Sequence, residues 1–243
     1  MTESYAVIAG GGTAGHLYPG LAVAEALISM GKTRTEIYFL TSDRDIDDQL
    51  LTAANFQFTP LKGKGIDRRS ILSSISAVIL LIKSTVFAYK YLRESKPKII
   101  LALGGFAAIP GAVAGLLTGT PVVLHEQNSV PGSANKLISK WAKKSAVSYE
   151  KTELPRRVYT GNPVRKEITD LSRSHRSMHR SQLGIPSGNK LVVVTGGSLG
   201  SLKINKSILD ALTTLSEVPN LTIYHIIGSR DWEELGQSTG ELG

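Results

Sequence analysis

Short apolar runs alternate with helix-like stretches along most of the chain. The apolar runs are rich in β-branched and aromatic residues, as strands buried on both faces are, and they occupy Tyr5–Ala9, Glu36–Thr41, Phe56–Leu61, Ile99–Leu103, Val122–His125, Ala146–Tyr149 and Arg157–Thr160. Helical patterns lie between them, over Pro19–Met30, Ser70–Arg93 and Pro110–Leu117. Gly31 and Gly119 stand where a left-handed residue would end a helix. Strands that alternate with helices predict right-handed crossovers and a parallel, doubly wound α/β sheet.

The same pattern starts again in the last third of the chain. Gly161–Arg165 is interpreted as a hinge, and residues 172–182 turn to Ser, Arg and His, which indicates a solvated connector or helix. A second Rossmann-like unit follows, with a strand, a second strand and a short helical piece at Lys190–Thr195, Leu221–Ile227 and Asp231–Gln237. Two strands do not bury a doubly wound sheet on both faces. We therefore expect a complete N-terminal domain over residues 1–164 and the first part of a C-terminal domain over 165–243, with a small self-contained appendage as the alternative.

Composition and charge narrow the class of protein. The chain has 243 residues, of which 42% are hydrophobic and 20% charged, so a globular fold is expected and disorder is not. It has 0 Cys, which excludes disulfides, thiolate zinc sites and a cysteine nucleophile. A net charge of +8 indicates an anionic partner, namely a nucleic acid, a phosphorylated ligand or an acidic lipid surface. Because the basic residues are scattered and form no known motif, nucleic acid is not expected.

Three glycine-rich turns each follow a predicted strand and lead into a helix. The sequence reads A-G-G-G-T-A-G-H over Ala9–His16, L-G-G-F-A-A-I-P over Leu103–Pro110 (with the pair Gly104 and Gly105), and T-G-G-S-L-G-S over Thr195–Ser201. Glycine lets the backbone approach a ligand, and a helix N-terminus offers free N–H groups to an anion. Three such turns suit a large phosphorylated ligand. The plainer interpretation is that glycine pairs only permit tight turns.

The first turn also fits a dinucleotide-binding pattern. Gly10, Gly12 and Gly15 satisfy G-x-G-x-x-G, and Asp43 follows the second strand, where an acidic residue binds the ribose of NAD. An NAD-dependent oxidoreductase is therefore an alternative, and it predicts stoichiometric NAD binding.

Polar residues follow the fifth predicted strand. His125-Glu126-Gln127-Asn128 ends a buried apolar run, at the edge where open α/β sheets bind ligands. Asn128 suits hydrogen bonds to sugar hydroxyls or a uracil edge, and capping of the following helix is the alternative. Arg165 ends Gly161-Asn162-Pro163-Val164-Arg165, where a guanidinium can bind a diphosphate through two hydrogen bonds. An ordinary surface arginine is the alternative there.

These motifs, in this order and spacing, strongly resemble the MurG family of bacterial transferases, which add N-acetylglucosamine to lipid I in peptidoglycan synthesis. H-E-Q-N and G-N-P-V-R carry the resemblance more specifically than any glycine pattern, and the resemblance covers nearly the whole chain. It implies a GT-B fold with two Rossmann-like domains, inversion at the sugar without a metal or other cofactor, and peripheral attachment to the cytoplasmic side of the cell membrane. It also implies two substrates, UDP-N-acetylglucosamine and lipid I, with transfer to the muramoyl 4-hydroxyl to form lipid II.

The resemblance assigns roles to particular residues. It places His16 at the acceptor diphosphate or near the reacting hydroxyl. The residues that it implies in substrate binding are Thr13, Ala14, Gly15, Gly104, Gly105, Asn128, Arg165 and Ser198. The sequence departs from the family at Phe106 and Ala107, where Tyr and Ser are usual, and at Leu199, where Gln is usual. The family's later donor-binding stretch has no counterpart here, so an inactive, truncated remnant that binds lipid I or a membrane is a further alternative.

The expected reaction needs a base and a group that stabilises the leaving diphosphate. His16 is the first candidate for the general base and Glu126 the second. Arg165 and the N–H groups after Gly197 are expected to stabilise the leaving group in place of a metal.

Two patterns could suggest a metal site, and neither is taken as one. Asp43-Arg44-Asp45 spells the D-x-D of metal-dependent glycosyltransferases, but it is far in sequence from the glycine turns. Ser42 and the acids after it predict a helix start instead. His175 and His179 are four residues apart among arginines, which favours a solvated helix face.

A membrane surface is the remaining expected partner. Ile71–Ile82 is almost wholly apolar, with basic residues at Lys62, Lys64, Arg68, Arg69, Lys83, Lys90 and Arg93 on both sides. Such a helix can lie at the surface of an anionic leaflet; a helix buried in the core is the alternative. The sequence has no secretory signal pattern and no uninterrupted run of about 18 apolar residues, so a helix that spans the bilayer is not expected.

Overall fold

A computed structural model of the chain describes residues 3–63, 71–171, 175–197 and 200–235. The chain divides into two compact units, Met1–Asp170 (unit 1) and Leu171–Gly243 (unit 2). Residues 165–170, which the sequence assigned to the second domain, cluster with unit 1. They include the short helix α6 (Lys166–Thr169).

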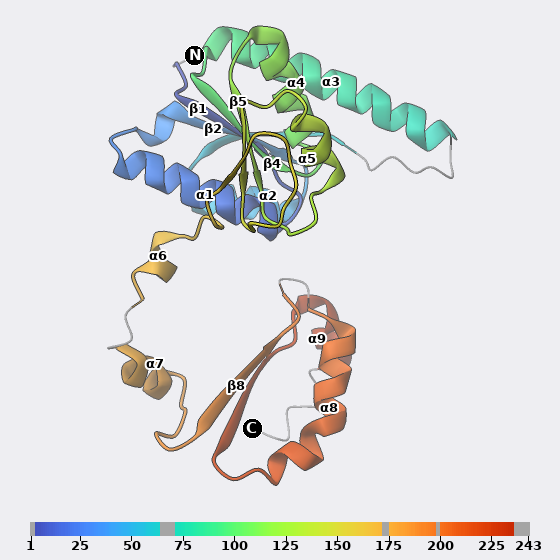
Figure 1. Cartoon of the computed structure of the whole chain (residues 1–243). Helices are drawn as coiled ribbons and strands as arrows, with labels where there is room; N and C mark the ends of the chain where they lie inside the picture. Colours follow the sequence, from blue (N-terminus) through green and yellow to red (C-terminus); the bar gives the residue numbers. More distant parts are fainter. Residues whose placement is uncertain (1–2, 64–70, 172–174, 198–199, 236–243) are drawn as a thin grey trace. The chain divides into compact units, whose positions relative to one another are not determined.

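Unit 1 is built on a seven-stranded parallel sheet (Figure 1). Its strands are β1 (Ala6–Gly10), β2 (Ile37–Ser42), β3 (Gln57–Leu61), β4 (Ile99–Gly104), β5 (Val122–Glu126), β6 (Lys144–Val147) and β7 (Arg157–Tyr159). The order across the sheet is β3-β2-β1-β4-β5-β6-β7, and neighbouring strands run parallel. Along the sequence, the strands from β1 to β3 extend the sheet in one direction, and those from β4 to β7 extend it in the other. Their shared carboxyl edge is the switch point at which open α/β sheets bind ligands.

Helices cover both faces of this sheet. The helices of unit 1 before α6 are α1 (Ala14–Ser29), the 3-10 helix η1 (Arg34–Glu36), α2 (Asp45–Ala53), α3 (Ile71–Ser95), α4 (Ala108–Thr118) and α5 (Ser133–Ile138). One apolar cluster joins the sheet to α1 and α2, and a second joins it to α3, α4 and α5. All five residues of β1 are buried, as the continuous apolar strand predicts. The doubly wound α/β class predicted from the alternating pattern is confirmed.

Helix α1 begins earlier than the sequence predicts. Pro19 was expected just inside the first turn, but the helix starts at Ala14, and Pro19 lies within it. The N-cap residue is Thr13, which is extended (φ −151°). Gly15 and His16 therefore belong to the first helical turn. Because proline has no N–H, the carbonyl of Gly15 lacks its usual donor four residues later.

Helix α3 presents one side to the unit and another away from it. Ala77, Ala88 and Leu92 are buried, whereas an exposed stripe is formed by Ile75, Val78, Ile79, Ile82 and Val86. Figure 1 shows the N-terminal part of α3 projecting beyond the rest of the unit. Over Ile75–Ser95 the helix is long and apolar enough to cross a membrane by length and composition alone, with a mean hydropathy of 1.5. The sequence analysis found no such segment because it required an uninterrupted apolar run. The side chains of residues 71–74 and the basic flank at 64–70 lie outside the described residues.

Unit 2 contains a smaller parallel sheet of two strands, β8 (Lys190–Thr195) and β9 (Leu221–Ile226). Its helices are α7 (Arg176–Gln182), α8 (Leu202–Ser216) and α9 (Ser229–Leu235). Val192 and Val193 are 46% and 54% exposed, and successive strand residues point to opposite faces. The described part of unit 2 therefore leaves apolar side chains open on both faces of its sheet.

Candidate active site

The glycine turn after β1 is held by a buried carboxylate on α2. Asp47 has no exposed surface, and its two oxygens accept hydrogen bonds from the N–H of Gly12 at 3.0 and 2.7 Å. The hydroxyls of Thr41 and Ser42 each donate to Asp47 Oδ2 at 2.6 Å. Arg44 donates from Nη1 to the carbonyl of Gly12 at 2.8 Å. Bonds to an ionised group are the stronger kind, so this network fixes the turn to β2 and α2.

The sequence analysis did not find Asp47 as part of the site. It interpreted Ser42 as a cap of the following helix, but α2 begins at Asp45 with Arg44 as its N-cap residue. Ser42 bonds Asp47 instead, through its N–H at 3.1 Å as well as its hydroxyl. The acidic residues at the start of α2 were the available signal. Sequence spacing alone does not show which of them turns inward to the glycines.

Two of the glycine turns are packed against each other. A Cβ at Gly11 would collide with the Asp47 carboxylate and the Thr41 hydroxyl. Gly105, after β4, has φ of +74°, and a Cβ there would come within 2.7 Å of the carbonyl oxygen of Gly11. Glycine is thus required for close approach of two loops as well as for turning the chain. These glycines therefore permit tight turns and also let the two turns lie close together.

His16 lies between these two turns. Its Nδ1 is 2.9 Å from the hydroxyl of Thr13. Its Nε2 side lies against Gly104, 3.3 Å from where a Cβ would be. Burial lowers the pKa of His16 below its ordinary 6.5, although the charges of Glu126 and Asp47 and the Gly11 carbonyl act in the opposite direction. The imidazole is therefore neutral at neutral pH and able to accept a proton.

Glu126, at the end of β5, organises the loop that follows it. It is 1% exposed. Its Oε1 accepts hydrogen bonds from the N–H and the side-chain amide of Asn128 at 2.9 and 3.0 Å. Its Oε2 accepts from the N–H of Gly132, which is the N-cap residue of α5, and from Asn135 at 3.0 and 2.9 Å. The alternative of loop capping fits Glu126, while Asn128 is exposed beside it. This geometry favours His16 over Glu126 as the base.

Two neighbours of Glu126 join the carboxyl edge together. Gln127 donates from its side-chain amide to the carbonyl of Leu103 at 3.1 Å, which links the ends of β5 and β4. His125 is buried, and its Nε2 lies 3.2 Å from the carbonyl of Gly161. Burial lowers the pKa of His125, with the Gly161 carbonyl and the charge of Glu126 acting against this. The start of the predicted hinge is thus attached to the sheet of unit 1.

Arg165 is attached to the same helix as His16. The guanidinium carbon lies 4.1 Å from the ring centroid of Tyr18 on α1. Stacking on an aromatic face orients a guanidinium and leaves its edge N–H groups available to an anion. Among the described residues of unit 1, the structure therefore gathers Thr13, Ala14, Gly15, His16, Gly104, Gly105, Glu126, Asn128 and Arg165 on neighbouring loops and one helix.

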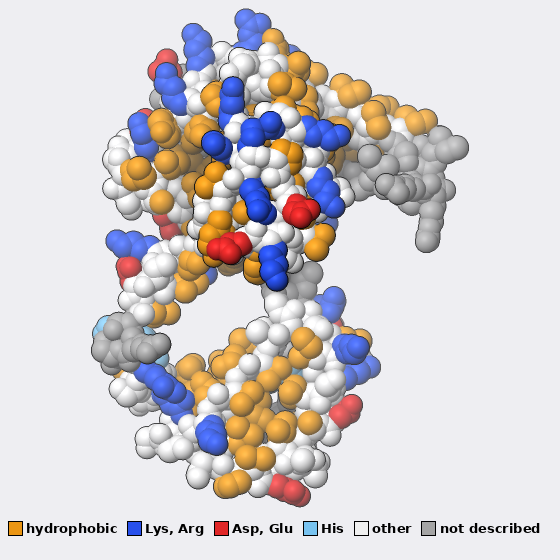
Figure 2. All heavy atoms as spheres, in the orientation of Figure 1, with side chains coloured by type: hydrophobic (Ala, Val, Ile, Leu, Met, Phe, Trp, Pro, Cys, Tyr) orange, Lys and Arg blue, Asp and Glu red, His pale blue; other side chains and the backbone are white. Residues whose placement is uncertain are grey.

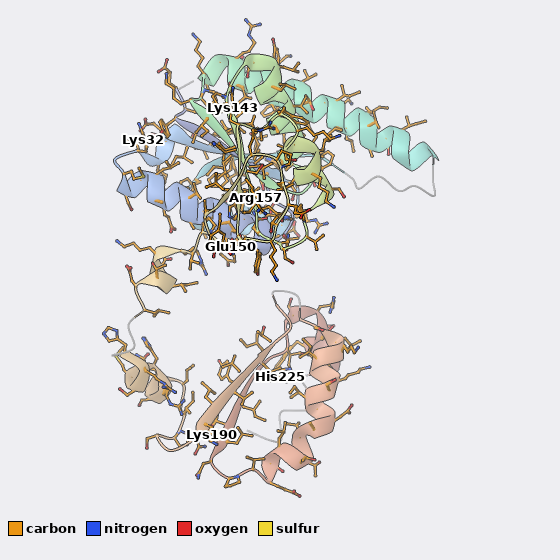
Figure 3. All side chains as sticks on the ribbon, in the orientation of Figure 1. Lys32, Lys143, Glu150, Arg157, Lys190 and His225 are labelled. Atoms are coloured by element: carbon orange, nitrogen blue, oxygen red, sulfur yellow. The ribbon has the colours of Figure 1, made fainter. Side chains whose placement is uncertain are left out.

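The third glycine turn belongs to unit 2. Ser198 and Leu199 lie outside the described residues. Around them, Arg230 donates to the carbonyl of Gly200 at 3.2 Å. Asn205 is fully buried and donates to the carbonyl of Ile227 at 3.0 Å and to the carboxylate of Asp231 at 2.9 Å. Figure 3 shows His225 between β9 and α8, where its Nε2 lies 2.9 Å from Asn205 Oδ1.

Comparison with known proteins identifies the family. A model of the glycosyltransferase family 28 N-terminal domain matches residues 6–147, and one of the family 28 C-terminal domain matches residues 191–243. Two similar curated relatives are both named UDP-N-acetylglucosamine–N-acetylmuramyl-(pentapeptide) pyrophosphoryl-undecaprenol N-acetylglucosamine transferase. The protein from Shewanella frigidimarina is 35% identical over 98% of this chain and 63% of its own length. The protein from Acetivibrio thermocellus is 31% identical over 97% of this chain and 64% of its own. The chain thus spans less than two thirds of these relatives.

Solved structures show the same fold. A crystal structure of Acinetobacter baumannii MurG has a TM-score of 0.66 at 24% identity, covering 96% of this chain and 61% of that one. Anabaena Alr3699/HepE in complex with UDP and glucose has a TM-score of 0.58 at 19% identity, covering 99% and 67%. These likenesses confirm the predicted GT-B architecture. The two family models together match more than half of the residues of this chain. The chain therefore belongs to glycosyltransferase family 28 and is MurG-like.

Proposed function

We propose that this chain acts in the transfer of N-acetylglucosamine from UDP-N-acetylglucosamine to the muramoyl 4-hydroxyl of lipid I, with inversion at the sugar. The curated relatives are named as N-acetylglucosamine transferases of UDP-N-acetylglucosamine and N-acetylmuramyl-(pentapeptide) pyrophosphoryl-undecaprenol, and UDP is bound in the structure of HepE, a neighbour in fold. The observation that carries the proposal is the position of His16, a neutral base between two glycine turns at the N-terminus of α1.

The acceptor diphosphate is assigned to the turn after β1. Helix α1 has 16 residues and begins at the turn, so its first N–H groups carry the positive end of the helix dipole. Its first turn contains no acidic residue that would compete with a bound anion. Gly104 and Gly105 lie beside this turn and let a sugar diphosphate approach without meeting a Cβ.

His16 is assigned the role of general base. With Nδ1–H donating to the Thr13 hydroxyl, Nε2 is the unprotonated ring nitrogen and is assigned to take the proton of the 4-hydroxyl. The 4-oxygen then forms a bond to C1 of the donor sugar while the bond from C1 to the diphosphate breaks, and UDP leaves with the electron pair. Glu126 is assigned a positioning role, because its carboxylate holds the side chain of Asn128. The amide of Asn128 is assigned to the hydroxyls or the uracil of the donor.

The leaving diphosphate needs cationic or N–H donors. Arg165, oriented by Tyr18, is assigned to it, together with the turn after β8 that contains Ser198. Residues 1–164 are proposed as the acceptor domain and 165–243 as part of the donor domain. The exposed stripe of α3 is proposed to rest on the anionic cytoplasmic face of the cell membrane, where lipid I presents its head group.

The test is a transfer assay on the full chain in detergent, with radiolabelled UDP-N-acetylglucosamine and a short-chain lipid I analogue. We expect labelled disaccharide product, and a decrease of about 10²- to 10⁴-fold in kcat for His16→Gln. His179→Gln, at an exposed histidine of α7, is the matched control. Stoichiometric binding of NAD without sugar transfer would instead support the oxidoreductase alternative.

Binding of lipid I without transfer is the second candidate function. It is favoured by the concentration of the described candidate residues in unit 1, which forms a complete sheet by itself. The same assay decides it: saturable binding of the lipid I analogue, with no labelled product at any concentration of UDP-N-acetylglucosamine, supports a non-catalytic binder and rejects the transferase.

A further inference from the structure

The segment Gly161–Arg165 (the 161–165 loop) is attached to unit 1 at both ends. At its start, Nε2 of His125 lies 3.2 Å from the carbonyl oxygen of Gly161. At its end, the guanidinium carbon of Arg165 lies 4.1 Å from the ring centroid of Tyr18 on α1. Because the loop is short, the position of its last residue depends on both attachments.

Within the described residues, the imidazole of His125 makes its hydrogen bonds through one nitrogen. Because the Gly161 carbonyl can only accept, Nε2 is the nitrogen that carries the proton. The hydroxyl of Ser148 lies 3.4 Å from the same nitrogen and donates to Oδ1 of Asn162 at 3.5 Å. The other nitrogen, Nδ1, is buried and has no partner in the part of the chain that the structure describes. The polar contacts of this side chain are therefore directed to the 161–165 loop.

The sheet itself gives no reason for a histidine at this position. His125 is 2% exposed, and the residues of β5 before it are apolar. Burial of an imidazole with one unpaired nitrogen is unfavourable, and an apolar residue of similar size would avoid that cost. Such a residue would lose the contacts to Gly161 and Ser148. The arrangement therefore favours a role for His125 in holding the loop over a role in the core of the sheet.

The backbone at Gly161 is held by hydrogen bonds and not by packing. Gly161 has φ of +74°, and nothing lies within 4 Å of where a Cβ would be. Its carbonyl accepts from His125 and, at 3.1 Å, from the hydroxyl of Thr160. Thr160 directly precedes Gly161, so its bond shapes the turn locally, whereas the bond from His125 connects the loop to the end of β5. Loss of the imidazole should therefore release the start of the loop.

A held guanidinium matters because charge alone does not define a diphosphate site on this unit. Figure 2 shows Lys and Arg side chains over much of the visible surface of unit 1. What Arg165 adds is a guanidinium stacked on Tyr18, in the same helix as His16. A planar guanidinium binds a phosphate through two parallel hydrogen bonds only when its orientation matches. A residue that fixes the other end of the loop therefore contributes to binding without touching the anion.

We propose that His125 is a positioning residue for Arg165. Its hydrogen bond to Gly161 fixes the start of the 161–165 loop, and the loop then holds the guanidinium against Tyr18, where it meets the diphosphate of the donor. The inference rests on the proposed sugar transfer, in which Arg165 is assigned to the leaving diphosphate. It adds to that reaction a residue that contacts no substrate atom.

The test is a double-mutant cycle in the transfer assay on the full chain, with kcat/KM for UDP-N-acetylglucosamine as the measured quantity. His125→Phe keeps a buried ring and removes the donor, and Arg165→Gln removes the guanidinium. Since a hydrogen bond to a charged group contributes roughly 10- to 100-fold, Arg165→Gln should lower kcat/KM by that factor and His125→Phe by about 10-fold. The double variant should lose no more than Arg165→Gln alone. Losses that multiply would overturn the proposal, because His125 would then act independently of Arg165.

Two further variants separate positioning from general stability. His125→Gln places an amide N–H near the position of Nε2 and should restore most of the lost kcat/KM. Arg156→Gln is the destabilised control, since Arg156 donates to the carbonyls of Ser139, Lys140 and Ala142 after the end of α5. It should lower the urea midpoint of unit 1 and leave kcat/KM unchanged. The positioning role is rejected if Arg156→Gln lowers kcat/KM as much as His125→Phe, or if His125→Gln restores nothing.

A measurement without substrate distinguishes failure of this inference from failure of the proposed reaction. The ring NMR signals of Tyr18, assigned with Tyr18→Phe, report the stacked guanidinium. They should shift in Arg165→Gln, shift towards the same positions in His125→Phe, and stay unchanged in Arg156→Gln. Wild-type positions in His125→Phe would overturn the positioning role. The expected shifts in a chain that transfers no sugar would support the positioning role and reject the proposed reaction alone.

Discussion

The turn after β1 and the turn after β8 have similar sequences but are held in different ways. In the first, a fully buried carboxylate accepts the N–H of Gly12, and Arg44 binds the Gly12 carbonyl. In the second, Arg230, whose side chain is 56% exposed, binds the carbonyl of Gly200. This difference shows that the glycine pattern specifies a tight turn but does not determine how rigid that turn is. Rigidity comes from neighbouring elements, and a buried ionic anchor constrains the turn more than an exposed one.

The largest effect is expected from removing the buried anchor. Asp47→Ala leaves the N–H of Gly12 and the hydroxyls of Thr41 and Ser42 without their acceptor, which we expect to cost about 3–5 kcal/mol of unfolding free energy. The measurement is urea unfolding of unit 1 followed through Trp141, in a Trp232→Phe background, because the two tryptophans lie in different units.

Asp48→Ala is the matched control for this experiment, because Asp48 is an exposed neighbour on the same helix. It should change the unfolding free energy of unit 1 by no more than about 0.5 kcal/mol. A similar small change for Asp47→Ala would mean that the turn is stable without its carboxylate. The contrast between the two glycine turns would then lose its basis.

The next largest effect is expected from adding a methyl group at Gly11, next to the Asp47 carboxylate. A Cβ at Gly11 would collide with the Asp47 carboxylate, so Gly11→Ala displaces the turn and should cost about 1–3 kcal/mol. Transfer or acceptor binding should fall together with stability, since His16 lies beside the same turn and bonds Thr13. Gly188→Ala is the control, because nothing lies within 4 Å of a Cβ at that position. If both variants unfold at the same urea concentration as wild type, close packing of the turn is not what requires glycine at Gly11.

The third prediction concerns pH and compares histidines of unit 1 and unit 2 whose pKa is lowered by burial. Burial lowers the pKa of His16 and His125 in unit 1 and of His225 in unit 2 below 6.5. Between the folded pKa and 6.5 the unfolded chain binds more protons, so stability rises with pH in that window. The contribution is complete above 6.5 and is lost as the pH falls through the folded value.

Urea unfolding at a series of pH values measures this dependence. His125→Gln should flatten the curve reported by Trp141 and leave the curve of unit 2, reported by Trp232 in a Trp141→Phe background, unchanged. A curve for unit 1 that rises on acidification below 6.5 would contradict the direction of these pKa shifts.

The sequence predicted the fold better than it predicted the anchors. Short, continuous apolar runs such as Val122–His125, rich in β-branched residues and separated by helical stretches, favour strands buried on both faces, so the strands follow from local composition. The start of α1 was placed too late, because a proline was taken as the first residue when Thr13 is the N-cap. Asp47 was missed and Glu126 was considered as a base because hydrogen-bond partners distant in sequence decide which way a carboxylate turns. Two observations, the 2.7 Å bond to Gly12 and the loop donors around Glu126, required the folded structure.

The smallest effect is expected from the exposed anchor of the turn after β8. Arg230→Gln removes the bond to the Gly200 carbonyl and the ion pair with Asp231, whose pKa is lowered chiefly by its hydrogen bond from Arg230. Because water and salt reach the exposed guanidinium of Arg230, unit 2 should lose less stability than unit 1 loses in Gly11→Ala. The loss should fade as salt is added. Asn205→Ala is the contrasting variant, since Asn205 is buried and bonds both Ile227 and Asp231. If Arg230→Gln destabilised unit 2 as strongly as Asn205→Ala, and equally at high salt, the arginine would have to be counted as a rigid anchor comparable to Asp47.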